Sequence, residues 1–211
     1  MTELNTLERI AAAYESDQLN GPAKVSRRSE LPVSYDAITD DWLTDVLCDS
    51  IPGAEVVGHR LDAPDDGSSN RRKISVEYNT AGQVAGLPTA LFCKASHGLS
   101  NRIMLGLSGA AHTEAAFYNS VRPLLNLEAP QNYFARLDPQ TFNSMIVLGD
   151  LSAGEIEFCS HETQMTRQLA ESQMAVLAEV HGKCYASPAI REHLAQFTTW
   201  PEYFANTMAF E

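Results

Sequence analysis

Two charged residues with apolar neighbours are the strongest candidates for chemistry in this sequence. Lys94 lies near the end of an apolar strand pattern that starts at Thr89, and Glu114 lies in a helical pattern with apolar residues three, four and seven positions later. Because an unpaired charge on such a surface costs several kcal/mol, each side chain needs a partner, and each is the obvious partner of the other. A strand lysine held by a helix carboxylate can reach phosphate oxygens, so we expect Lys94 and Glu114 to form a phosphate-binding pair.

Both residues also have an ordinary structural interpretation. A lysine at a strand end can extend its ammonium to solvent, and a glutamate near a helix N-terminus is favoured by the helix dipole. A plain α+β domain in which Lys94 and Glu114 never meet is therefore an open alternative. The occurrence of both residues in this order favours the pair.

A turn between the first two expected strands is a candidate for phosphate contacts. It spans residues 65–70, and its small residues allow backbone amides to approach phosphate oxygens closely. Asp65 and Asp66 do not favour phosphate, and a hairpin turn needs no function, so a purely structural turn is an equal alternative. The candidate contacts are Gly67, Ser68, Ser69 and Asn70.

A second turn follows the apolar run 144–148. This strand pattern ends abruptly in the sequence Gly-Asp-Leu-Ser, where backbone N–H and C=O groups can hydrogen-bond the edge of an adenine ring. The side chains there are only loosely constrained, and any buried strand followed by a turn has a similar sequence. The candidate adenine contacts are Leu148, Gly149, Asp150 and Leu151.

The elements that must position these residues follow an α+β plan. Alternating and continuous apolar patterns predict strands in an antiparallel meander at 56–61, 73–78 and 89–95, then two more at 131–138 and 143–148. Helical spacing predicts helices at 39–48, 103–107, 111–121, 163–185 and from 188 onward, with Thr39 or Asp40 as the cap of the first. Spacing at 7–14 permits a further short helix, and 79–86 is a turn-rich connection. We expect a helical leader (1–50), a sheet unit (51–151) and a run of helices (152–211).

Charge and composition argue against several classes of function. The net charge of -12 disfavours nucleic acid and anionic membranes as partners, because both need a basic face, and residues 71–73 form the only basic triplet. The sequence has neither a membrane-spanning apolar run nor a secretory signal, so a cytoplasmic protein is the default expectation. Cys93 lies in an apolar run and is expected to be buried. The cysteines have no CxxC spacing, which disfavours zinc or disulfides; they are Cys48, Cys93, Cys159 and Cys184.

The order of these features resembles the aminoglycoside-phosphotransferase-like superfamily, close to its ecdysteroid-kinase-like and "phosphotransferase enzyme family" branches. The segments that carry the resemblance are LPTALFCKAS, LGLSGAAHTEAAFYNSV, FNSMIVLGDLSAG and the helix AESQMAVLAEVHGKCYASP, within residues 38–190. The resemblance implies a protein-kinase-like fold, with a five-stranded antiparallel N-lobe sheet, a C-type helix and the first C-lobe helices. It also implies transfer of the γ-phosphoryl group of ATP to a small-molecule hydroxyl with Mg²⁺. Lys94 would contact the phosphates, Glu114 would hold it, and residues 148–151 would receive the adenine.

Two departures from that family pattern concern Gly149 and the catalytic loop. Gly149 stands where the family often has an acidic residue. The catalytic loop H-G-D-x-x-x-x-N, which orients the hydroxyl and binds metal, has no counterpart, because no histidine here has an aspartate two residues later. The nearest imitation, at His181, lies within a helix pattern and is interpreted as a helix-face histidine. The histidines are His59, His97, His112, His161, His181 and His193.

These departures predict that this chain carries the nucleotide-binding half of a kinase and is inactive alone. Helical apolar spacing continues up to Glu211, so we expect a longer enzyme of which this is part. The alternative is a non-catalytic half-kinase that binds nucleotide or a partner, and that forms a homo-oligomer if the chain ends there. The acceptor alcohol cannot be identified from this sequence.

Overall fold

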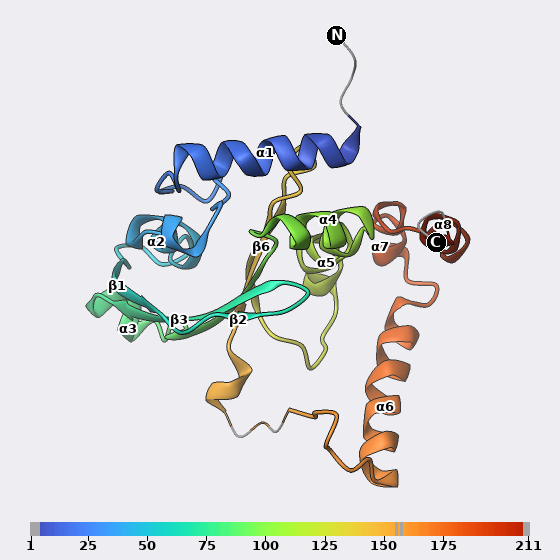
Figure 1. The fold of residues 1–211 in the computed structure, drawn as a ribbon. Helices are drawn as coiled ribbons and strands as arrows, with labels where there is room; N and C mark the ends of the chain where they lie inside the picture. Colours follow the sequence, from blue (N-terminus) through green and yellow to red (C-terminus); the bar gives the residue numbers. More distant parts are fainter. Residues whose placement is uncertain (1–4, 155, 157, 209–211) are drawn as a thin grey trace.

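A six-stranded antiparallel sheet lies at the centre of an α+β structure (Figure 1). The computed structural model describes residues 5–154, 156 and 158–208. Strands follow the order β1-β3-β4-β6-β5, and β2 pairs with β3 outside this path. The strands are β1 (Val56–Leu61), β2 (Asp65–Asp66), β3 (Asn70–Tyr78), β4 (Ala90–Ala95), β5 (Asn132–Leu137) and β6 (Ser144–Gly149).

The predicted antiparallel meander is confirmed, since β1 pairs with β3 and β3 with β4. The prediction of five strands was wrong, because Asp65 and Asp66 pair with Arg71 and Asn70 to form the sixth strand β2. Strand β3 also begins three residues earlier than its alternating pattern indicated. Aspartate disfavours strands, and the short β2 forms only because the turn folds back on β3.

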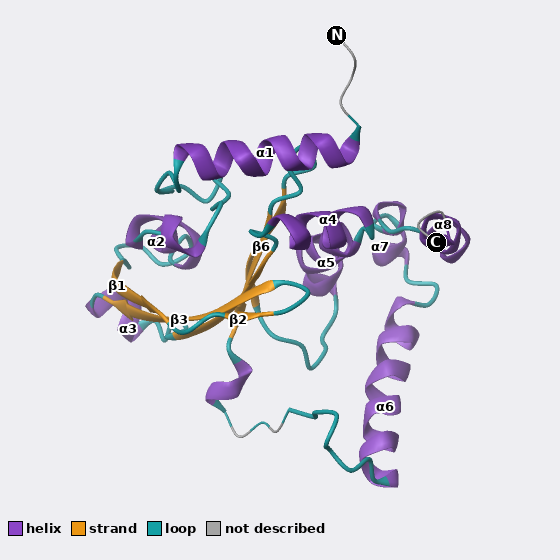
Figure 2. Ribbon diagram, viewed as in Figure 1, coloured by secondary structure: helices purple, strands orange, loops and turns teal. Residues whose placement is uncertain are grey.

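Most of the helices lie above the sheet and to its right in the view of Figure 2. Their bounds are α1 (Thr6–Asn20), α2 (Asp40–Leu47), α3 (Thr80–Val84), α4 (Leu99–Leu107), α5 (Ala110–Ala116), α6 (Arg167–Cys184), α7 (Pro188–Arg191) and α8 (Trp200–Met208). Thr39 is the cap of α2, as predicted, because its hydroxyl accepts a hydrogen bond from the Trp42 N–H.

Three helix predictions needed correction. The turn-rich connection 79–86 contains the short helix α3, which Asn79 caps by accepting from the Gly82 N–H. The helix predicted at 111–121 is α-helical only to Ala116 and continues as a π-helical turn from Phe117 to Val121. Helix α6 begins at Arg167 instead of Thr163, because Thr166 accepts a hydrogen bond from the Leu169 N–H and so caps it.

One face of the sheet carries the main hydrophobic core. Trp42 and Leu43 of α2 are completely buried against this face, and Trp42 meets Phe134 edge-on with 5.0 Å between ring centroids. The strands contribute every second residue to this core, including Ile74 and Leu91. Cys93 is fully buried in the same core, as predicted, and burial raises the pKa of its thiol.

The N-terminal helix α1 is joined to α4 through a buried charge. The Arg102 side chain is completely buried, and its guanidinium donates to Asp17 Oδ2 at 2.5 Å. It also lies over the ring of Tyr14 at 5.6 Å. Because a buried guanidinium requires a counter-charge, this pair ties the leader to the body of the protein.

The opposite face of the sheet is only partly covered. Helix α5 packs over its β5–β6 end, where Ala115 contacts Ala135 and Ile146. The alternation of β1, β3 and β4 leaves a largely polar surface beyond α5, which we call the open face. The open face includes Arg60, Arg71, Lys73, Ser75, Glu77, Phe92 and Lys94.

The C-terminal helices have less contact with the sheet. In Figure 1, α6 lies to one side of the sheet, and none of its residues is buried. Met174 and Leu177, apolar residues of the helix predicted at 163–185, are exposed. Further on, Ile190 is buried against Val121 and Leu125. No helix among the described residues is long and apolar enough to cross a membrane.

Candidate functional site

Lys94 and Glu114 form the predicted ion pair. Lys94 Nζ lies 2.6 Å from Glu114 Oε1 and 2.8 Å from Oε2, so the pair links β4 to α5. The two side chains are 31% and 33% exposed, which leaves the ammonium accessible to a ligand. The alternative in which these residues never meet was therefore wrong.

The local sequence of α5 explains why Glu114 reaches the sheet. Gly109 precedes the helix with a left-handed φ of 74°, which a residue without a side chain adopts readily. Ala111 and Ala115 are buried on the sheet-facing side, and their small side chains let the helix lie close to the strands. The longer Glu114 side chain then extends past them to Lys94.

The turn 67–70 is held firmly in place beside this pair. Asn101, near the start of α4, donates from Nδ2 to the carbonyls of Gly67 and Ser68, each at 2.9 Å. Asn70 Oδ1 accepts from the Gly98 N–H at 2.9 Å. Asn101 was not identified from the sequence, because nothing in its neighbourhood shows that the turn, more than 30 residues away, would approach it.

The acidic residues of the turn have local partners. Asp65 pairs with Arg71 at 3.0 Å, and Asp66 accepts a hydrogen bond from Asn70 Nδ2 at 3.2 Å. Their charges are therefore partly compensated before any ligand arrives. This weakens the objection, raised from the sequence, that two aspartates disfavour phosphate at this turn.

Cations gather on the open face in spite of the acidic net charge. Arg71 lies directly opposite Lys94 in the β3–β4 register, and Lys73 lies directly opposite Phe92. The basic triplet 71–73 is thus divided between the two faces, because Arg72 points to the core side and lies over Tyr35. Strand alternation could have revealed this division. Four cations of this face each pair with a carboxylate: Arg60 with Asp62, Arg71 with Asp65, Lys73 with Asp150 and Lys94 with Glu114.

The end of β6 brings the predicted adenine-binding segment to the same face. Asp150 Oδ2 lies 3.2 Å from Lys73 Nζ. Burial alone would raise the pKa of Asp150, but hydrogen bonds from Ser152 and Lys73 outweigh it and lower the pKa. The N–H groups of Gly149 and Asp150 already donate to Gln131 and Ala90 carbonyls, whereas the Leu151 N–H donates to no backbone carbonyl of the described residues.

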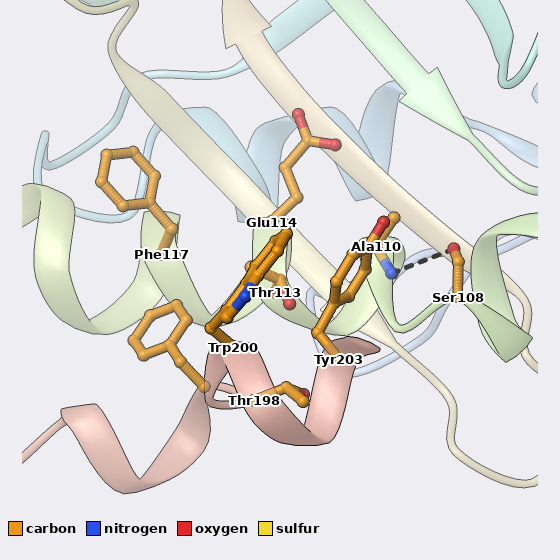
Figure 3. A pocket seen from close by; sticks show the side chains of 9 residues that line it. Ser108, Ala110, Thr113, Glu114, Phe117, Thr198, Trp200 and Tyr203 are labelled. Atoms are coloured by element: carbon orange, nitrogen blue, oxygen red, sulfur yellow. Dashed lines mark hydrogen bonds between the residues drawn. The ribbon is translucent and has the colours of Figure 1, made fainter. Parts of the chain in front are cut away.

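Two cavities border Glu114. A small one, of about 20 Å³, is lined by Ser69, Lys94 and Glu114 among others, so it connects the turn with the ion pair. A larger one, of about 780 Å³, lies between α5 and α8. Figure 3 shows the Glu114 carboxylate directed away from the rings of Trp200 and Tyr203, which line this larger cavity. The ion pair therefore belongs to the open face.

Comparison of the chain with protein-family models, curated proteins and solved structures found no match. The site geometry is therefore the basis for a functional assignment. That geometry combines an accessible ammonium with a fixed carboxylate partner, a tethered turn of small residues and an exposed strand end on one sheet face.

Proposed function

We propose that this chain binds ATP on its open face and is the nucleotide-binding part of an ATP-dependent small-molecule phosphotransferase. The observation that carries this proposal is the Lys94–Glu114 pair, which joins a central strand to the helix α5 beside the turn 67–70. In kinases, a pair of this kind positions a lysine on the phosphates. The sheet with α5 would then be a kinase-like N-lobe, and residues 148–151 would connect it to the helical C-lobe.

The chemistry of the two side chains supports phosphate binding. An ammonium has three N–H donors, and Glu114 accepts from Lys94 through both of its oxygens. The third donor is left for a phosphate oxygen. Arg71 and Lys73 on the same face offer further N–H donors, although each is already paired with a carboxylate.

The adenine would lie between the phosphate contacts and the end of β6. Phe92 is half-buried on the open face, two residues before Lys94 and opposite Leu148 in the sheet. Its ring offers an apolar surface on which a base can stack. The Leu151 N–H is then available to the edge of the base.

Phosphoryl transfer itself relies on positioning and on stabilisation of charge. The sequence contains no H-G-D-x-x-x-x-N loop, so we expect the 211-residue chain alone to bind ATP without transferring its γ-phosphoryl group to an alcohol. The resemblance to phosphotransferases implies Mg²⁺. Among the described residues, however, no group of three His, Cys, Asp or Glu side chains could hold a metal ion, so none is assigned to it.

Calorimetric titration of the chain with ATP tests the proposal. Lys94→Met should weaken ATP binding at least about 10-fold, or about 1.4 kcal/mol, because it removes the ammonium from the phosphates. Glu114→Gln should weaken it less, because it only releases the lysine. Lys183→Met is the matched control, since Lys183 forms a similar lysine–glutamate pair with Glu179 on α6. Equal ATP affinity in the wild type and Lys94→Met would contradict the proposal.

A second candidate function is that of a non-catalytic module that binds a partner. The exposed apolar side chains of α6, including Met174 (59% exposed) and Leu177 (46% exposed), favour it. Sedimentation velocity over a range of concentrations would show self-association if the partner is a second copy. A monomer at all concentrations that binds ATP would favour the first proposal.

A further inference from the structure

Asn101 lies behind the turn 67–70 and hydrogen-bonds two of its carbonyls. The residue is 7% exposed, and its Nδ2 donates two hydrogen bonds of 2.9 Å to the carbonyls of Gly67 and Ser68. A single buried amide thus fixes two consecutive peptide units. Without Asn101, both carbonyls would lose their side-chain partner, and the turn would lose two hydrogen bonds that fix its conformation.

These two hydrogen bonds also determine where the neighbouring N–H groups point. In a planar trans peptide, the C=O of one residue and the N–H of the next point in opposite directions. The N–H groups of Ser68 and Ser69 therefore point away from Asn101. Neither donates a backbone hydrogen bond within the described part of the chain, whereas the Gly67 N–H donates to the Ser69 carbonyl.

The turn presents these N–H groups next to cations. Ser69 lines the small cavity shared with Lys94 and Glu114. The guanidinium of Arg71 lies close to Gly67, since a Cβ built there would meet Arg71 Nη2 at 3.3 Å. Successive free backbone N–H groups beside cations are a recurring arrangement for binding phosphate.

Gly98 makes room for Asn101. A Cβ at position 98 would lie 2.7 Å from Asn101 Oδ1, which is closer than real contacts allow. The Asn101 amide cannot easily move aside, because its other atom holds the turn. Gly98 has an ordinary extended backbone, so the close approach is what requires glycine here.

We infer that Asn101 is a positioning residue that orients the turn 67–70, so that the Ser68 and Ser69 N–H groups bind the oligophosphate of a nucleoside triphosphate. This inference rests on the proposed function, because it takes the ligand of the open face to be ATP. It gives Asn101 the role of orienting the phosphate-binding part of the site, which is separate from the adenine-binding part.

Binding of ATP, adenosine and inorganic tripolyphosphate to the full chain tests this inference. Asn101→Asp keeps the shape of the side chain but replaces the donor with an acceptor that repels both carbonyls. It should raise the ratio of the ATP to the adenosine dissociation constant about 10-fold, as expected for weakened hydrogen bonds to charged phosphate. Gly98→Ala should produce a change in the same direction without adding a charge, because its methyl group displaces Asn101.

Asn119→Asp is the matched control. Its Nδ2 donates to one carbonyl, that of Ala135, at 2.8 Å and away from the turn. This variant should lower thermal stability and leave the ratio of the two dissociation constants unchanged. A purely structural role for Asn101 would weaken ATP and adenosine binding equally.

The outcomes separate the inference from the proposed function. Unchanged ATP affinity in both Asn101→Asp and Gly98→Ala, or an equal loss for ATP and adenosine, overturns the role of Asn101 and leaves the ATP site standing. Wild-type binding of tripolyphosphate without adenosine, lost in Asn101→Asp, supports the role of Asn101 and overturns the ATP assignment. Wild-type protein that binds none of the three ligands overturns both.

Discussion

The two faces of the sheet use the same strands for different purposes. On the core side, Ile74 and Leu91 are buried in one cluster with residues of α2 and of the segment that precedes it. On the open face, their neighbours Lys73 and Phe92 remain accessible, and the cations there are paired with carboxylates. Because side chains alternate along a strand, neighbouring residues can serve stability and binding separately. Substitutions one residue apart should therefore have effects of different kinds.

The largest effect on stability is expected from Leu91→Ala. Leu91 is completely buried, and loss of its side chain from the core should lower the free energy of unfolding by about 2–5 kcal/mol. Urea denaturation measures this loss. Below the transition, the folded variant should bind ATP with nearly wild-type affinity.

Phe92→Ala is the matched change on the open face. It should cost less stability than Leu91→Ala and weaken ATP binding more, because it removes the apolar surface for the base. If Leu91→Ala and Phe92→Ala lower the free energy of unfolding and the ATP affinity by equal amounts, the two faces do not have separate roles.

A smaller effect is expected from acid, through His97 near the core side. Burial, together with the nearby guanidinium of Arg102, lowers the pKa of His97 to about 3. The unfolded chain takes up a proton at His97 below about pH 6.5, whereas the folded protein does not. Stability should therefore fall as the pH falls from about 6.5 toward 3, by up to about 1.4 kcal/mol per pH unit.

Urea denaturation at pH 7 and pH 5 measures this contribution. The wild type should lose about 2 kcal/mol between these pH values because of His97, and His97→Asn should lose correspondingly less. Other groups contribute equally to both proteins, so the difference between them isolates His97. Parallel losses in the two proteins would mean that His97 is protonated in the folded state.

The smallest effect on stability is expected on the open face itself, from Lys73→Met. Lys73 is 43% exposed, and partly exposed ion pairs contribute only about 0–1 kcal/mol. ATP binding should nevertheless weaken severalfold and become less sensitive to salt, because a cation near the phosphates is lost. Titrations at low and high ionic strength measure both changes. Unchanged affinity at low salt would place the phosphates away from β3.

The sequence was most informative where a single local pattern determined the structure. The strand pattern ending at Lys94 and the helical stripe containing Glu114 predicted two elements, and the cost of unpaired charges predicted their contact. The cap at Thr39 and the buried Cys93 were also predicted from local chemistry.

Features that depend on tertiary contacts were missed. The role of Asn101 depends on the approach of a turn more than 30 residues earlier, for which no local pattern exists. The sequence argued against a basic face because the net charge is acidic and only one basic triplet occurs. Strand alternation, however, decides which cations lie on the same face. Helical spacing predicted α6, but such spacing does not say which surface a helix will contact.

The buried pair of Arg102 and Asp17 has a consequence for the leader. Arg102 follows Asn101 on α4. The residue that pairs with Asp17 of α1 is therefore the direct neighbour of the residue that hydrogen-bonds the turn 67–70. An N-terminal truncation that removed α1 would take away both the Asp17 carboxylate and the Tyr14 ring that Arg102 contacts, so the guanidinium would lose its counter-charge. Helix α1 is therefore part of the folding unit, and natural variation at Asp17 should be coupled to variation at Arg102.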